Sequence, residues 1–153
     1  MLKKLLNTKM LKNQKGLTLI ELLAVIVILA IVAAIAVPAI GNIIENTRYN
    51  AAKADAINVL NAANLYFTDE GSVDGATVNV KTLKASGYLD NAGKFDVTGD
   101  STGATVTKAA GGNKISGSVT YSGDKTATFT DATLVGINAD NQKGSGTPTA
   151  ITN

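Results

Sequence analysis

The sequence contains no cysteine, no histidine and no tryptophan, and only two prolines among 153 residues. Without cysteine, the chain can form no disulfide, no thiolate metal site and no thiol nucleophile. Without histidine, catalytic triads, imidazole bases and imidazole metal ligands are excluded as well. These absences leave only carboxylates for catalysis or metal binding, and we expect a protein that is no enzyme and has no metal site and no cofactor.

Acidic residues remain, but their spacing does not indicate an ion site. Asp69, Glu70 and Asp74 cluster beside two glycines. A calcium loop needs oxygen ligands at alternate positions and a distant bidentate glutamate, which this cluster lacks. We expect these carboxylates to lie in solvated turns.

The charges are distributed unevenly. Five of the 14 basic residues lie in the first 16 positions, which contain no acid; the rest of the chain has 9 basic and 12 acidic residues. A mildly acidic remainder is a poor nonspecific ligand for nucleic acid. We therefore predict no specific nucleic-acid partner.

Residues 17–40 are apolar except for Thr18 and Glu21, and Leu22 to Ala36 has no polar side chain. A helix of about 20 apolar residues spans a bilayer. The preceding lysines favour a cytoplasmic N-terminus, which places the bulk of the chain outside. An alternative is a secretory signal removed at a small-residue site such as Ala34-Ile35-Ala36.

The run Gly16-Leu17-Thr18-Leu19-Ile20-Glu21, followed by the apolar segment with Pro38, resembles the N-terminus of type IV pilins and pseudopilins. The resemblance covers about Lys15 to Gly41. It implies that a prepilin peptidase cuts after Gly16 and methylates the new N-terminus at Leu17. The leader is longer than many in that family, and Met10 offers a second start.

Glu21 is expected to act in assembly. A carboxylate inside a spanning helix costs a few kcal/mol, about 3 on insertion scales. A cut after Gly16 creates an ammonium on Leu17 about one helical turn away, which can pair with Glu21 of the same chain or of a neighbour. The alternative is a carboxylate that reaches the lipid headgroups. Pro38 and Gly41 predict a helix kink, because proline removes one N–H.

Beyond the membrane segment, Ala56, Leu60, Ala63 and Phe67 form an apolar helical stripe, with Lys53, Asp55, Asn58, Asn61 and Asn64 facing solvent. A short helix is expected over 81–86. Period-two patterns then predict strands at Phe95–Val97, 105–107, 115–121, 127–129 and 134–137, with a hairpin turn at Ser122-Gly123-Asp124.

These patterns give an α+β fold, in which a long N-terminal helix packs on a small antiparallel sheet. The expected divisions are a cleaved basic leader, an apolar filament-core segment, an amphipathic continuation of the helix, a β-rich head and a flexible polar tail: 1–16, 17–41, 42–70, 71–137 and 138–153.

The resemblance implies a structural subunit of a type IV pilus, held in the cytoplasmic membrane as a precursor and later part of an extracellular filament. Its partners would be itself, as a helical homopolymer, the peptidase and methyltransferase, the assembly platform and minor pilins. The alternatives are a pseudopilin of a type II secretion or DNA-uptake system, and an uncleaved membrane-tethered binding protein. Many pilins of bacteria with an outer membrane contain a disulfide, so the lack of cysteine favours a bacterium without that membrane.

Overall fold

The computed structural model describes the backbone of residues 2–96 and 103–153 and the side chains of residues 18–96 and 103–153. Val97 of the first predicted strand lies outside the described residues. The chain divides into two compact units, Met1–Gly41 and Asn42–Asn153. Each unit is described by itself below. From here on, the head means the whole second unit, Asn42–Asn153, and not only the β-rich segment 71–137.

The longest element is α1 (Leu2–Asp69), whose residues 42–69 belong to the head. It contains Pro38, which lacks an N–H and leaves the carbonyl of Ala34 without its helical partner. The helix ends as the sequence predicts, because Gly71 adopts a φ of 58° that other residues rarely reach.

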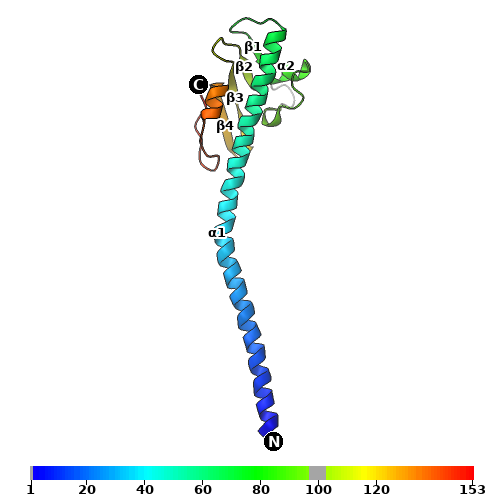
Figure 1. The fold of residues 1–153 in the computed structure, drawn as a ribbon, viewed down its shortest axis with the longest axis vertical. Helices are drawn as coiled ribbons and strands as arrows, with labels where there is room; N and C mark the ends of the chain where they lie inside the picture. The colour runs from blue at the N-terminus through cyan, green and yellow to red at the C-terminus, as the bar shows by residue number, and fades with distance from the viewer. Residues whose placement is uncertain (1, 97–102) are drawn as a thin grey trace. The chain divides into compact units, whose positions relative to one another are not determined.

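The predicted apolar stripe forms the helical part of the core. Ala56, Leu60, Ala63 and Phe67 are each no more than 4% exposed. They pack with side chains from all four strands and from α2 (Val80–Ala85). The stripe prediction is therefore confirmed, and Figure 1 shows α1 lying along the sheet within the head.

The sheet has four antiparallel strands in the order β1-β2-β3-β4. Their bounds are Thr77–Asn79, Thr105–Thr107, Lys114–Ser122 and Lys125–Thr133. The β3–β4 hairpin turns at Gly123, with a φ of 52°, where the Ser-Gly-Asp sequence predicts a turn. The α+β fold class is confirmed, whereas β1 is a strand that the sequence analysis did not predict.

Two predicted strand segments are wrong. Phe95 lies in a short 3₁₀ helix, η1 (Gly93–Phe95), although its side chain is buried in the core. Leu134–Ala139 forms helix α3, because the Thr133 hydroxyl accepts a hydrogen bond from the Gly136 N–H and caps its first turn. Period-two apolar spacing over four residues does not separate a short strand from one helical turn.

The residues expected to form a flexible tail make specific contacts. Ile151 is 3% exposed and pairs in parallel with Phe129 at the edge of β4. Its N–H donates to the Thr128 carbonyl, and its carbonyl accepts from the Thr130 N–H, both over 2.9 Å. The C-terminal segment, residues 140–153, thus covers part of an open strand edge.

Candidate functional site

The predicted cleavage and methylation residues, Gly16 and Leu17, lie in the helical backbone of α1. The side chain of Leu17 lies outside the residues whose side chains the structure describes. Glu21 follows one turn later and is exposed. Four residues make about one helical turn, so α1 places residue 21 one turn beyond residue 17, and the pairing of Glu21 with the new N-terminus stays a prediction.

The apolar part of α1 presents its side chains outward. Between Leu19 and Ile40, the large apolar side chains are from 49% to 72% exposed. The helix is long and apolar enough to span a membrane, with a mean hydropathy of 3.1 in its most apolar window. Apolar surface on this scale is unfavourable in water, at roughly 25 cal/mol per Å², so lipid or protein must cover it.

A second exposed surface of α1 lies in the head and carries no charge. It comprises residues spaced alternately by four and three positions, and we call it the uncharged face: Thr47, Ala51, Ala54, Asn58, Asn61, Leu65 and Thr68. Every exposed residue of α1 between Arg48 and Asp69 is uncharged. Spacings of four and three residues place these side chains on one face of the helix, and their small or uncharged side chains would allow another helix to approach it.

The two charged residues of that stretch are turned toward the head, which corrects the prediction that they face solvent. Lys53 pairs with Asp140 over 3.1 Å and also donates to the Asp140 main-chain carbonyl over 2.5 Å. Asp55 accepts the backbone N–H of Lys94 over 2.8 Å and so holds the loop around η1. Both charges have partners within the head, and the exposed face stays neutral.

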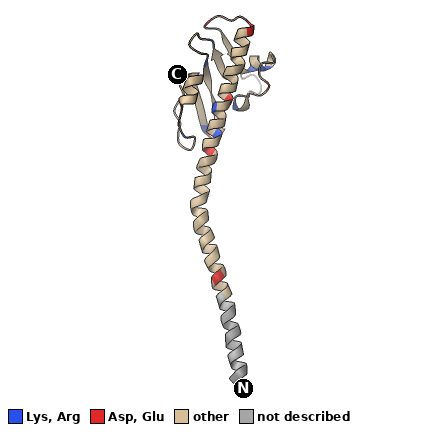
Figure 2. Ribbon diagram, viewed as in Figure 1, with Lys and Arg blue, Asp and Glu red and all other residues tan. Residues whose placement is uncertain are grey.

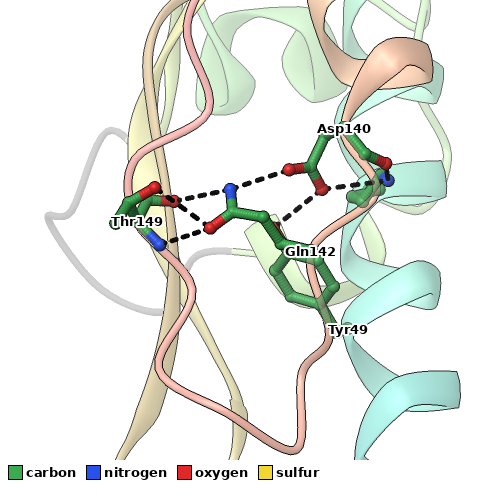
Figure 3. Close-up of polar contacts among 5 residues, drawn as sticks. Tyr49, Asp140, Gln142 and Thr149 are labelled. Carbon is green, nitrogen blue, oxygen red and sulfur yellow. Dashed lines mark hydrogen bonds and ion pairs between the residues drawn. The ribbon is translucent and has the colours of Figure 1, made fainter.

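Asp140 is the centre of a polar cluster that joins the C-terminal segment to α1 (Figure 3). Its carboxylate accepts hydrogen bonds from the Tyr49 hydroxyl over 3.0 Å and from the Gln142 amide over 2.7 Å. Gln142 in turn binds the backbone and the hydroxyl of Thr149, which closes the loop between them.

The cluster also shifts the acidity of its members. Burial opposes ionisation of Asp140, but hydrogen bonds from Gln142, Lys53 and Tyr49, together with the Lys53 charge, lower its pKa overall. Burial and the adjacent Asp140 carboxylate raise the pKa of the Tyr49 phenol. The carboxylate is therefore held charged and the phenol neutral, which is the pairing that the hydrogen bonds need.

A second set of contacts lies one to two turns earlier on α1. Lys125, which begins β4, pairs with Glu45 over 2.6 Å and donates to the Ser145 carbonyl over 2.8 Å. Asn46 accepts the Ser145 N–H over 2.9 Å. Gly144 packs so closely that an added Cβ would lie 2.4 Å from the Tyr49 Cβ. Sequence reasoning missed both sets of contacts, because the residues of α1 lie 80 residues or more from the partners that they bind in β4 and the C-terminal segment.

Residues 18–96 and 103–153 contain no group of three acidic side chains that could hold a metal ion. Asp140 already uses both carboxylate oxygens within the head.

Residues 11–37 match the family model of the prokaryotic N-terminal methylation motif. The chain carries the precursor signature of type IV pilins and pseudopilins. This signature covers Gly16, Leu17, Glu21 and most of the exposed apolar stretch. No curated protein sequence and no solved structure matches the chain.

The prepilin signature implies processing by a prepilin peptidase and assembly into a pilus-like filament. It belongs to structural, pilin-type proteins and not to an enzyme family. Membrane insertion followed by assembly into a surface filament fits both the signature and the apolar helix.

Proposed function

We propose that this chain is a structural subunit of a type IV pilus, cut after Gly16, methylated at Leu17 and polymerised through α1. The observation that carries the proposal is that the prepilin signature stands on the same helix as the uncharged face. A tethered monomer would need an apolar span, but it would have no need of a neutral helix face along the head. In a bundle, that face packs against helices of other copies.

Glu21 selects the register of the polymer. Its carboxylate lies four positions beyond Leu17, whose new ammonium would neutralise it within one chain or between neighbours. A copy one step out of register leaves both charges unpaired in apolar surroundings, which costs several kcal/mol per ion, roughly 3 or more. Pro38 and Gly41 supply a kink that lets neighbouring helices fit around each other.

The test is to measure the intact mass and N-terminal peptide of the chain in filaments sheared from cells. A chain that begins at methylated Leu17 and is abundant there supports the proposal. Chains with an intact leader, found only in membranes, would favour the uncleaved tethered protein. The signature is shared with pseudopilins, and that alternative predicts lost secretion or DNA uptake, without visible filaments, when the chain is deleted.

Variants separate processing from assembly. Glu21→Ala should leave insertion and cleavage intact and sharply reduce filaments, whereas Gly16→Leu should leave uncut precursor in the membrane. Ala54→Asp places a charge on the uncharged face and should reduce filaments at normal membrane levels. Ala85→Asp, at an exposed alanine of α2, is its control. Normal filaments from Glu21→Ala would contradict the register role.

A further inference from the structure

Exposed apolar side chains of the head gather at the two ends of its helix. Ile43 and Ile44 are 63% and 45% exposed where the head begins, and Leu65 and Val73 are 61% and 76% exposed where α1 ends. Apart from α3, these are the large apolar side chains that the described part of the head leaves exposed. Apolar side chains that form a contiguous patch rimmed by polar residues mark a contact surface.

The residues around the distal pair are mainly acidic. Asp69, Glu70 and Asp74 are exposed beside Leu65 and Val73. One cation lies near them, since Lys108 donates from Nζ to the Ser72 carbonyl over 2.5 Å. We call this surface the acidic end.

The residues around the proximal pair are mainly basic. Arg48 is exposed, and its guanidinium donates to the Ser122 hydroxyl over 3.2 Å, which brings the β3–β4 hairpin to the same end. Lys143 is exposed beside Gly144, which packs against Glu45 and Tyr49.

Two acids lie among these basic residues. Glu45 is paired with Lys125, and Asp124 is exposed. We call the surface formed by Ile43, Ile44, Arg48, Lys125 and Lys143 the basic end. With Glu45 and Asp124 counted, this end has three basic and two acidic residues, and Lys125 pairs with Glu45; the acidic end has three acidic residues and one basic residue.

The two ends cannot meet within one head. They are separated along α1 by about 33 Å between Arg48 and Glu70, at 1.5 Å per residue. Figure 2 shows red where α1 ends, and blue together with some red toward the opposite end of the head. Two different, complementary patches on one chain make a heterologous contact, which generates a ring if the rotation between copies closes and an open helical filament if it does not.

We propose that the acidic end of one head docks on the basic end of a second copy of this chain. Leu65 and Val73 then pack against Ile43 and Ile44, while Glu70 and Asp74 face Arg48 and Lys143. The contact rests on the proposed pilus function and extends the packing of the uncharged face, to which Leu65 belongs, by joining the heads. Its charges contribute orientation and specificity, and its apolar side chains contribute affinity.

The test compares filament yield from cells expressing the full chain with charges reversed at one end or at both. Glu70→Lys with Asp74→Lys alters the acidic end, and Arg48→Glu with Lys143→Glu alters the basic end. These four side chains are exposed, and Lys125 is left in place because it holds Glu45. Lys81→Glu with Lys94→Glu is the matched control, at exposed residues of α2 and η1.

Each single-end reversal should lower sheared filaments by about tenfold, with normal amounts of cleaved chain in membranes, because like charges then face each other. The fourfold variant should recover to within about twofold of wild type, since both ends are reversed together. Unchanged filaments in the single-end variants, or no recovery in the fourfold variant, would overturn the docking contact alone. Absence of filaments in the wild type would overturn it together with the proposed function.

Discussion

Replacing Asp140 with alanine should strongly destabilise the head. The Asp140 side chain is 6% exposed and its partner Lys53 is 14% exposed. Breaking a buried ion pair by removing one partner costs about 3–5 kcal/mol, because a buried charge is left unpaired. Lys53 keeps its hydrogen bond to the main-chain carbonyl of residue 140, so we expect a loss of about 3 kcal/mol.

Two further variants give smaller expected losses of stability, against which the loss in Asp140→Ala can be compared. Tyr49→Phe removes one hydroxyl donor but keeps the ring, which contacts Tyr121 edge-on at 5.3 Å, and should cost about 1 kcal/mol. Asp90→Ala, at an exposed carboxylate, should change the free energy of unfolding by less than about 0.5 kcal/mol. For a unit of this size, a loss of about 3 kcal/mol lowers Tm by about 12 °C.

The measurement is thermal unfolding of the full chain in detergent micelles, followed by the near-ultraviolet circular dichroism of its tyrosines. Tyr49 and Tyr121 are buried in the head, so their signal reports head packing. A double-mutant cycle with Lys53→Ala isolates the energy of the pair. A Tm for Asp140→Ala within 2 °C of that for Asp90→Ala, about half a kcal/mol, would refute the assigned role of Asp140.

Two other predictions concern the same region. Gly144→Ala should lower the stability of the head by more than about 1 kcal/mol, because its Cβ would lie 2.6 Å from the Glu45 carbonyl oxygen. Gly146→Ala should be tolerated, because the atom nearest to its Cβ is 3.5 Å away. Equal unfolding midpoints in urea would contradict this close packing. Because the pKa of Asp140 is lowered in the folded head, its contribution is fully present above about pH 4 and is lost as the pH falls through the folded-state pKa. Asp140→Asn should weaken this acid-induced loss, and an unchanged pH profile would assign it to other carboxylates.

The sequence predicts the long helix and its core stripe because their signals are local and repeated. An apolar run without polar interruption allows few structures, and spacings of three and four residues identify one helix face. The hairpin at Gly123 is equally local, since a glycine between polar turn residues suits a tight reversal. The prepilin signature is local too, which is why it is visible in one sequence.

The errors occur where structure depends on distant residues. Leu134–Ile137 has the spacing of a strand, but the Thr133 cap and the close approach of Thr152 to Gly136 accompany a helix there. The C-terminal segment is polar and rich in glycine, which is typical of loose chain. Its contacts with the rest of the head are made by Asp140, Gly144 and Ile151, whose partners lie on α1 and β4.

The union of α1 with the C-terminal segment also has a consequence for the order of folding. Tyr49 and Asp140 are 91 residues apart, and Asn46 and Ser145 are 99 residues apart. Contacts of such long range form slowly, because a large loop must close before they add stability. In the proposed pilus subunit, the edge of β4 lacks its parallel partner and Tyr49 lacks its acceptor until residues 140–151 have crossed the membrane. In that subunit the head completes its fold only after Ile151 has crossed the membrane, and until then its open strand edge is free to pair with other chains.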